Sequence, residues 1–319
     1  MAWTTAIGDN IIRAELWSSQ LKDVLQEQLI DATKYVDWLT EFPDGTTFTI
    51  PSVGDPQVDD YVEDTAITFR ATDTGEFNFT ITEYLASGTY VTDKMKQDSF
   101  YMNKIISTFI PKQARAIAET VEADILSLAM SQTASNPNTI NGAHHRFVAT
   151  GTNEVLTLGD FAKAWYTLDK ANVPQTNRVA IVDPSVAYTL STLTNVVNLL
   201  SPNQKWSPIV HDGIATGMKF AVNVYGFDVY TSNFLPDANE TITAWAGALT
   251  TAAGKANMFF SADSDVLPFV GAWRQMPKVE TKRNMDFQRD EYVTTARYGR
   301  KLYRPENLVV ILSDTDQVT

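Results

Sequence analysis

The chain lacks cysteine altogether, which excludes disulfide bonds, thiolate metal ligands and a cysteine nucleophile. No run of apolar residues approaches the ~18 that a membrane-spanning helix needs, so we expect no membrane partner. Met1-Ala2-Trp3 leads straight into polar residues, without the basic and apolar regions of a signal peptide. The 319 residues are 44% hydrophobic and 20% charged, which is the composition of an ordinary folded protein. Non-covalent packing, or covalent chemistry that does not involve cysteine, must therefore hold the protein together.

Sequence motifs of catalysis are missing as well. Gly213 and Gly217 have no lysine directly after them, so they do not form a phosphate-binding loop. The zinc-peptidase pattern H-E-x-x-H and the nucleophile-elbow pattern G-x-S-x-G do not occur. We expect a protein that is not an enzyme, with no catalytic residue, cofactor or metal site.

Two clusters that could hold a metal ion have a simpler interpretation. His144 and His145 are adjacent, so they cannot face one ligand from a regular helix or strand, and we predict a solvated pair in a loop. The acidic run 59–64 offers oxygen ligands, but it lacks the ligand spacing and the central glycine of a calcium loop. We interpret this run as the solvated tip of a hairpin.

Charge is unevenly placed along the chain. The net charge of −13 argues against general nucleic-acid binding, which needs a basic face. Residues 1–100 hold 18 acidic and 6 basic residues, whereas residues 271–305 hold 9 basic and 4 acidic ones. Two interpretations stay open. The faces are solvated and differ by chance, or identical copies meet with an acidic hairpin against a basic C-terminal region.

The second interpretation predicts a set of contacts between copies, because complementary charges set the register and orientation of two partners. The acidic members lie in the predicted hairpin and are Asp59, Asp60, Glu63 and Asp64. The basic members lie near the C-terminus and are Arg274, Lys278, Lys282, Arg283, Arg289, Arg297 and Arg300.

The hairpin is predicted over residues 43–90, a stretch without a single lysine. Apolar residues alternate with polar ones there, as in half-buried strands, at Phe48 and Ile50, at Ile67 and Phe69, and at Phe77, Phe79 and Ile81. Proline, glycine and aspartate clusters at 43–45, 54–56 and 73–75 supply the turns. A hairpin so long and so charged has little apolar surface with which to fold back onto its own domain. We therefore expect the hairpin to contact something outside its own domain.

The rest of the chain mixes predicted helices with predicted strands. Helices are expected over 7–39, over about 98–130 with a kink or break at Pro111, after a capping box at Thr157 and Asp160, and after Asp183-Pro184. Strands are expected at 179–182, at 222–230 with an interruption at Gly226, around Phe259 and Phe260, as an antiparallel pair from Lys278 onward, and at 308–312. The five apolar residues of 308–312 imply burial on both faces. Residues 136–153 are predicted to be a polar loop and a domain boundary.

Three segments resemble one known family. Residues 223–236, Asn-Val-Tyr-Gly-Phe-Asp-Val-Tyr-Thr-Ser-Asn-Phe-Leu-Pro, are similar to a strand that recurs in the major capsid proteins of tailed bacteriophages. Residues 298–311, Tyr-Gly-Arg-Lys-Leu-Tyr-Arg-Pro-Glu-Asn-Leu-Val-Val-Ile, are similar to the closing strand of that family. Residues 168–174, followed by residues 178–184, resemble the helix and strand that open its axial domain. Together with an N-terminal arm, an extended hairpin and a long helix upstream, the resemblance covers nearly the whole chain.

The resemblance implies an α+β fold of the Hong Kong 97 type. Its parts would be an N-terminal arm (1–42), an extended loop (43–90), a peripheral domain with a long spine helix (91–152 and 266–319) and an axial domain (153–265). The implied function is that of a structural major capsid protein. Its copies would form the hexamers and pentamers of an icosahedral virion shell around double-stranded DNA, assembled in the cytoplasm of a bacterial host. The negative net charge fits this function, because a like-charged wall does not trap the DNA.

The chain also departs from patterns seen in parts of that family. Some members join the extended loop to a neighbour through a lysine–asparagine isopeptide bond, but no lysine lies between Tyr35 and Asp93. We therefore expect a clasp closed by charge and packing, which favours reinforcement by a cement protein. Some members begin with a scaffolding segment that is cleaved away. Here Met1 stands a few residues ahead of the arm, so we expect a separate scaffolding protein, together with a portal.

Two other functions stay open. An encapsulin-like nanocompartment would share the fold and hold enzyme cargo, and the neighbouring genes would separate it from a phage shell. A carboxylate-based hydrolase stays open because pairs of carboxylates occur anywhere in a chain with 38 acidic residues.

Overall fold

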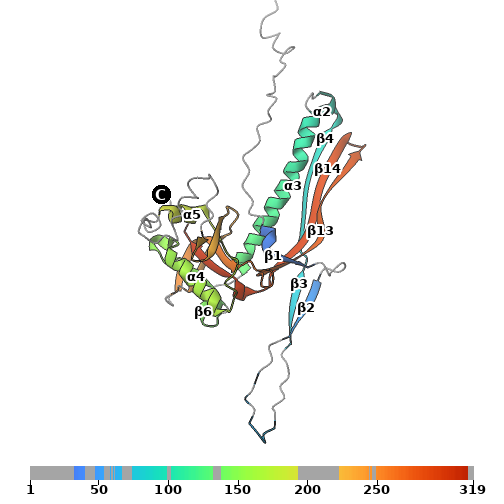
Figure 1. Cartoon of the computed structure of the whole chain (residues 1–319). Helices are drawn as coiled ribbons and strands as arrows, with labels where there is room; N and C mark the ends of the chain where they lie inside the picture. The colour runs from blue at the N-terminus through green and yellow to red at the C-terminus, as the bar shows by residue number, and fades with distance from the viewer. Residues whose placement is uncertain are drawn as a thin grey trace, which may run out of the picture.

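The computed structural model of the chain is built around two large β-sheets (Figure 1). It describes residues 32–39, 47–53, 58, 60, 62–66, 74–98, 102–131, 138–192, 223–243, 245 and 249–314. Within these residues, one sheet has seven strands, the other has four, and two short hairpins stand beside them.

The seven-stranded sheet is covered on both faces. Its order is β7-β15-β12-β8-β10-β9, with β11 paired to β12. The strands are β7 (Arg146–Val148), β8 (Arg178–Val182), β9 (Asn223–Val224), β10 (Phe227–Thr231), β11 (Asp237–Thr243), β12 (Leu249–Ser261) and β15 (Val309–Ser313). On one face, α4 (Leu158–Lys170) and α5 (Pro184–Thr192) pack against the sheet in one apolar cluster. The other face belongs to a second cluster, so β8 and β15 are buried at every position.

The four-stranded sheet is long and lies along one helix (Figure 1). Its order is β1-β13-β14-β4. The strands are β1 (Val36–Leu39), β13 (Phe269–Asn284), β14 (Arg289–Leu302) and β4 (Glu83–Thr92). The helix α3 (Met102–Leu126) contacts β4 and β14, and the short α2 (Asp93–Asp98) follows β4. Burial alternates along β4, with Tyr84 and Tyr90 exposed on the face away from α3, so this sheet is covered on one face only.

The remaining described elements are short. The projecting hairpin consists of β2 (Thr47–Val53) and β3 (Thr74–Thr80), and a second hairpin consists of β5 (Thr139–Ile140) and β6 (Ala143–His144). The 3-10 helices are η1 (Ala32–Tyr35), η2 (Ser127–Ser131), η4 (Thr152–Glu154) and η5 (Pro305–Asn307).

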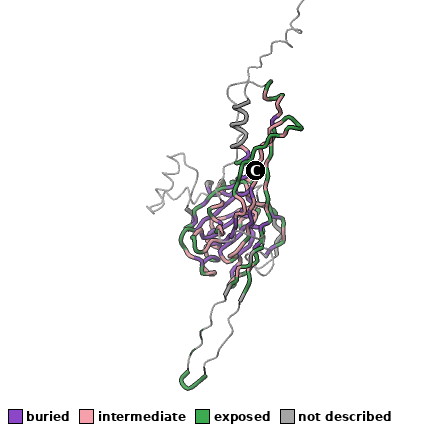
Figure 2. The backbone as a smooth tube through the Cα atoms, turned by 90° about the vertical axis from the view of Figure 1, so that its right-hand side faces the viewer, coloured by how far each residue is buried: buried purple, intermediate pink, exposed green. Residues whose placement is uncertain are grey.

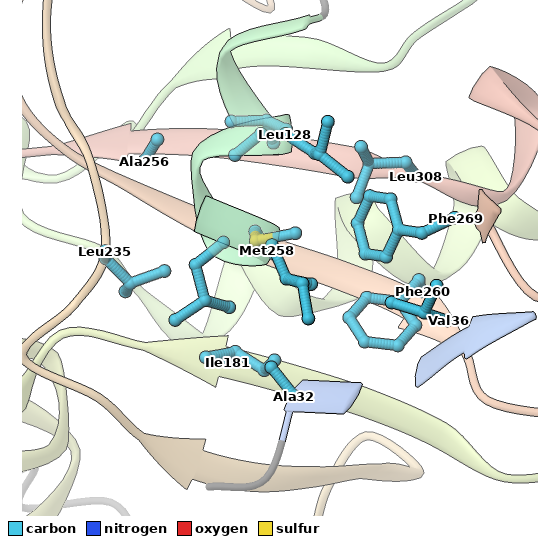
Figure 3. Packing of buried hydrophobic residues seen from close by; sticks show 14 of the residues in the cluster. Ala32, Val36, Leu128, Ile181, Leu235, Ala256, Met258, Phe260, Phe269 and Leu308 are labelled. Carbon is cyan, nitrogen blue, oxygen red and sulfur yellow. The ribbon is translucent and has the colours of Figure 1, made fainter. Parts of the chain in front are cut away.

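One apolar core joins the two large sheets at the C-terminal end of α3. Figure 3 shows Leu128 of η2, Ile181 and Met258 of the seven-stranded sheet, and Phe269 of β13 converging in this core. Because residues from both sheets share one buried cluster, the sheets form a single packed body.

Two arginines hold the same helix end. Arg300 Nε on β14 donates to the Asp124 carbonyl at 2.5 Å, and Arg146 Nη1 on β7 donates to the Ala129 carbonyl at 3.0 Å. The carbonyl end of a helix carries a partial negative charge, so a cation is favourable there. Each sheet supplies one of the two cations, and Glu240 balances the buried Arg146.

Several local predictions are confirmed. The capping box of Thr157 and Asp160 opens α4, with the Thr157 N–H donating to Asp160 Oδ2 at 3.0 Å. Asp183 accepts the N–H of Ser185 at 2.9 Å at the start of α5. The interruption between β9 and β10 is a tight turn in which Gly226 takes a positive φ of 81°. The antiparallel pair predicted from Lys278 onward is β13–β14, which begins earlier, at Phe269.

The helix predicted over 7–39 is wrong at its C-terminal end. Ala32–Tyr35 forms a 3-10 turn and Val36–Leu39 forms β1, which pairs in parallel with β13 from Val36 opposite Phe269. Val36 is buried in the shared core, so a distant strand decides the local conformation. The helical stripe at Leu21, Val24, Leu25 and Leu29 lies outside the described residues.

A kink or a division of the long helix was predicted at Pro111, and the division is wrong, because α3 continues through this residue. A proline inside a helix costs ~3 kcal/mol, since it removes one hydrogen bond and crowds the preceding turn. The buried stripe Ile117, Val121 and Ile125 after the proline packs into the shared core, which offsets that cost.

The stretch predicted as one hairpin, 43–90, contains two structural units. The β2–β3 ladder ends at Thr80, and β4 instead pairs with β14, from Glu83 opposite Tyr298 to Thr92 opposite Arg289. The region 136–153, predicted to be a loop, contributes β7 to the seven-stranded sheet.

The buried Arg178 contributes to the stability of the core of the seven-stranded sheet. Its guanidinium is buried 4.0 Å from the Trp165 ring, pairs with Asp169 at 2.5 Å, and donates to the carbonyls of Pro174 and Val173. We expect Arg178→Met to lower the free energy of unfolding by about 2–4 kcal/mol, because these acceptors lose their donors inside the fold. Chemical denaturation of unassembled subunits measures this loss. The exposed Lys94→Met is the matched control, and equal midpoints for the two variants would contradict the expectation.

Candidate functional site

The β2–β3 hairpin leaves the body of the molecule as an arm (Figure 1). Its ladder runs from Thr47 opposite Thr80 to Val53 opposite Thr74. A turn lies farther out, where the Thr65 N–H donates to the Val62 carbonyl at 3.2 Å. Figure 2 shows this turn as exposed residues at the far end of the arm. The tip of the arm is therefore accessible to another molecule.

The described tip carries both charge and apolar surface. Asp60, Glu63 and Asp64 are exposed, as predicted for contact residues, and Asp59 lies outside the described residues. Val58 and Val62 are 95% and 65% exposed beside them. Sequence reasoning selected only the acids, although the two valines stand in the same run of residues. A partner surface that complements this tip needs cations and some apolar area.

The base of the hairpin is packed firmly onto the long sheet. Phe79 and Ile81 are buried in a small cluster with Val270 and Ala272 of β13. Lys301 Nζ of β14 donates to the carbonyl of Asn78 at 2.7 Å. The arm is therefore fixed at its base while its tip is exposed.

Gly299 on β14 permits this close approach. A Cβ at Gly299 would lie 2.9 Å from the Ile81 Cα and from the Thr80 carbonyl oxygen, which are backbone atoms that cannot swing aside. At Gly88 of β4, a Cβ would make two ordinary contacts, with the Val293 side chain at 3.7 Å and with the Tyr292 carbonyl oxygen at 3.9 Å. The two glycines of one sheet thus differ in the space around them.

We expect Gly299→Ala to lower the free energy of unfolding by about 1–3 kcal/mol through overpacking at the hairpin base. Gly88→Ala should be neutral or slightly stabilising, because alanine restricts the unfolded chain more than glycine does. Chemical denaturation of unassembled subunits of both variants makes the comparison. Equal stabilities would show that the hairpin base can shift at no cost.

The predicted basic contact residues lie on β13 and β14, but several have acidic partners in their own chain. Arg300 is buried to 14% exposure and pairs with Asp124 at 3.1 Å and Glu83 at 3.2 Å. Arg289 pairs with Glu291 at 2.7 Å, and its guanidinium lies 4.7 Å from the ring centre of Tyr90. These two arginines stabilise the subunit itself.

Arg283 joins a cluster at the end of the strand pair. It binds Asp93 of α2, and it pairs with Asp290 of β14 at 3.1 Å. The hydrogen bond from Arg283 lowers the pKa of Asp93, and hydrogen bonds from Lys96 and Arg283 lower the pKa of Asp290. Sequence reasoning missed this cluster, although the pairing of Arg283 with Asp290 across the hairpin was the signal for it.

The other predicted bases are more available. Lys278 pairs at 2.7 Å with Glu280, and both side chains are well exposed. Lys282 is exposed and Arg297 is half-buried, and neither forms an ion pair with the described part of the chain. Arg274 is half-buried at the start of this stretch. Lys278 and Lys282 are therefore the best-placed cations for a contact with another molecule.

His145 is not the solvated loop residue that the sequence predicted. It is fully buried, and its Nδ1–H donates to the Leu308 carbonyl at 3.1 Å, while His144 in β6 is half-exposed. The prediction failed because β7 begins at the next residue and carries His145 into the sheet. Burial lowers the pKa of His145 from its ordinary 6.5, and the hydrogen bond to Leu308 only partly opposes this.

This burial predicts a pH effect on stability. The unfolded chain binds a proton at His145 as the pH falls below 6.5, whereas the folded chain keeps the ring neutral, so acid favours unfolding. We expect His145→Asn to be less stable than the parent at pH 7.5 and to lose less stability between pH 7 and 5. Denaturation at both pH values measures the difference. His144→Asn should keep the parental slope, and equal slopes for all three proteins would refute the assignment.

Within the described ranges, no three histidine, aspartate or glutamate side chains gather as a metal site. No helix in the same ranges is long and apolar enough to cross a membrane.

Comparison with known proteins decides the family. A model of the family described as phage capsid protein matches residues 74–311, about three quarters of the chain. The chain belongs to the phage capsid protein family. It is a structural protein, the major capsid protein of a tailed phage, and it belongs to the virion capsid. A search of curated proteins finds no match.

Solved capsids share the fold of this capsid protein. The capsid structure of the cyanophage P-SCSP1u matches with a TM-score of 0.70 at 18% identity, over 97% of this chain and 95% of that chain. The structure of Mycobacterium phage Che8 matches with a TM-score of 0.66 at 19% identity, over 93% of this chain and 95% of that chain. The mature capsid of bacteriophage PhiM1 matches with a TM-score of 0.67 at 12% identity, over 96% of this chain and 93% of that chain. The predicted α+β fold of the Hong Kong 97 type is confirmed.

Proposed function

We propose that copies of this chain assemble as the hexamers and pentamers of an icosahedral shell that encloses double-stranded DNA without sequence-specific binding. The family match over residues 74–311 carries the proposal. The projecting arm supports the proposal, because a long exposed hairpin can contact a second copy that lies next to the first. The net charge of −13 also suits a container for a polyanion.

The proposed parts of the subunit follow the capsid fold. The N-terminal arm is assigned to 1–42, the extended loop to 43–90, the peripheral domain to 91–152 with 266–319, and the axial domain to 153–265. The long sheet with α3 supports the peripheral assignment. The five strands β8 to β12 of the seven-stranded sheet, with α4 and α5, support the axial assignment, and β7 and β15 join that sheet from the ranges assigned to the peripheral domain. The pairing of β4 with β14 suggests that the extended loop proper ends near Thr80.

Contacts between copies are proposed to join the acidic tip to the basic strand pair. The acidic side comprises Asp59, Asp60, Glu63 and Asp64. The basic side comprises Arg274, Lys278, Lys282, Arg283, Arg289, Arg297 and Arg300, and Lys278 and Lys282 contribute most because the other cations are more buried or better paired within the chain. An exposed ion pair contributes only ~0–1 kcal/mol, but a shell repeats each pair many times.

Other partners complete the proposal. Assembly takes place in the bacterial cytoplasm with a separate scaffolding protein, and a portal provides the entry for DNA. A cement protein is the proposed reinforcement, because the arm has no lysine with which to cross-link a neighbour covalently.

Imaging of the purified protein tests the shell directly. Expression alone, and together with the scaffolding protein from the same genome, should give uniform closed particles in negative-stain electron microscopy. Only monomers under both conditions would overturn the assembly proposal.

A charge reversal tests the contact. We expect Asp60→Lys, Glu63→Lys and Asp64→Lys together to abolish particles, because like charges then face each other between copies. Subunit stability should stay unchanged, since these side chains are exposed. Adding Lys278→Glu and Lys282→Glu to the triple variant should restore some particles.

Particle yield by sedimentation measures both effects. Asp265→Lys, at an exposed acid far from the tip in sequence, is the control and should assemble normally. Normal assembly of the triple variant would refute the proposed contact and leave the shell itself standing.

A further inference from the structure

Tyr225 has a backbone conformation that does not suit its side chain. Together with Gly226 it forms the two-residue turn between β9 and β10, and its φ is 49°. Both residues of the turn have a positive φ, as in a type I′ turn, for which asparagine followed by glycine is the preferred pair. A positive φ is strained for a residue as bulky as tyrosine. The subunit therefore carries a strained tyrosine where asparagine would fit with less strain.

The residues around Tyr225 are buried, whereas Tyr225 itself is exposed. Val224 and Phe227 lie in the apolar cluster beneath α4. A Cβ at Gly226 would lie 2.6 Å from the Trp165 ring, so the turn packs directly against α4. Tyr225 is nevertheless 52% exposed. The fold thus presents a large aromatic side chain at the surface, on a turn whose position is fixed.

The turn lies at one edge of the seven-stranded sheet. Among the described strands, β9 ends the order of this sheet. Tyr230 and Asp228 on the adjoining strand β10 are exposed as well. We name Tyr225, Asp228 and Tyr230 the tyrosine edge. Tyrosine is enriched where protein surfaces meet, so this composition favours an interface.

A second aromatic surface lies at the opposite edge of the sheet, where β7 ends the order and β6 comes directly before it. Trp245 packs edge-on against Tyr166 of α4 and His144 of β6, with ring centroids 6.2 and 5.9 Å apart. Lys163 Nζ lies 5.8 Å from the centre of the Trp245 ring. Tyr166 and Lys170 are exposed on α4. We name these five residues the tryptophan edge.

The helix α4 lies between the two surfaces. Its Trp165 ring is 5.9 Å from the Phe227 ring beside the β9–β10 turn, whereas its Thr167 Oγ1 donates to the His144 carbonyl at 3.3 Å. These two helix positions point ~200° apart, because each residue of a helix turns by ~100°. One copy therefore presents the two edges on opposite flanks. A ring of identical copies needs such an arrangement, since each copy meets its two neighbours through two different surfaces.

We propose that the tyrosine edge of one copy packs against the tryptophan edge of the next copy in a ring, with Tyr225 beside Tyr166 and Trp245. This inference rests on the proposed function, because it needs hexamers and pentamers. Aromatic rings that pack edge-to-face stabilise such a contact beyond the area that they bury. Burial of Tyr225 against the next copy also offsets the strain in its turn.

Charge gives the contact a direction. Asp228 belongs to the tyrosine edge and Lys170 to the tryptophan edge, so opposite charges meet only when unlike edges face each other. Asp228 lies three residues from Tyr225, ~10 Å along a strand. Lys170 lies four residues from Tyr166, ~6 Å along a helix, and the length of the lysine side chain covers the difference. The aromatic contact and the ion pair therefore form together in a head-to-tail arrangement.

One substitution separates the strain from the contact. We expect Tyr225→Asn to raise the melting temperature of unassembled subunits by about 2 °C, because asparagine suits a positive φ. The same variant should need at least about tenfold more subunit to form particles, because it lacks the aromatic anchor. Tyr225→Phe keeps an aromatic ring and is the matched control, with parental values for both measurements. Particles from Tyr225→Asn at the parental concentration would overturn the contact.

Engineered cysteines identify the two surfaces, since the chain contains no other cysteine. Shells of the double variant Tyr225→Cys with Tyr166→Cys are oxidised mildly and separated on a non-reducing gel. We expect a ladder of disulfide-linked copies that ends at the hexamer, because each copy links to the next one around the ring. The two single variants are the controls and should stay monomeric, because their cysteines lie on different edges.

The outcomes separate this inference from the proposed function. Shells of the double variant that give no ladder would overturn the pairing of the two edges while assembly stands. Dimers from Tyr225→Cys alone would overturn the choice of the second surface, because two tyrosine edges would then meet. If the parent chain forms no particles, alone or with the scaffolding protein, the proposed function is overturned and this inference with it.

Discussion

The C-terminal end of α3 is the point on which the two large sheets depend. Arg300 from the long sheet donates to the Asp124 carbonyl of α3, and Arg146 from the seven-stranded sheet donates to the Ala129 carbonyl of η2, which directly follows α3. A helix end buried without such donors would leave several carbonyls unsatisfied. The two cations remove that cost and set the position of each sheet relative to the same helix. Tyr298, whose hydroxyl donates to Asp124, adds a third link to this end.

The two sheets differ in how much of their surface the subunit covers. The seven-stranded sheet is packed on both faces and has the character of a domain core. Within the part of the chain that the structure describes, the long sheet is covered by α3 on one face only, the edge of β13 beyond Ala272 has no paired strand, and the tip of the arm is exposed. A protein whose function is to contact its own copies is expected to divide its surface in this way. Because the chain has no cysteine, disulfide bonds contribute nothing to such contacts.

Charge in the C-terminal region serves two purposes that the sequence does not separate. Arg283, Arg289 and Arg300 are engaged by acids of the same chain, so they stabilise the end of the strand pair and its joint with α3. Lys278 and Lys282 are left more exposed along the edge of β13. A count of basic residues over 271–305 indicated the right strands. It could not tell which cations face outward, because pairing with Asp93 and Asp124 joins residues that are far apart in sequence.

Features set by neighbouring residues followed from the sequence alone. These include the capping box at Thr157, the turn at Gly226, the buried closing strand and the exposed acidic tip, because each depends on chemistry within a few positions of the chain. The resemblance to capsid proteins came from such local segments too. Tertiary structure alone decided the strand at Val36–Leu39, the pairing of β4 with β14 and the burial of His145. In each of these cases the partner lies more than a hundred residues away, so the packing energy that settles the conformation has no signature in the local pattern.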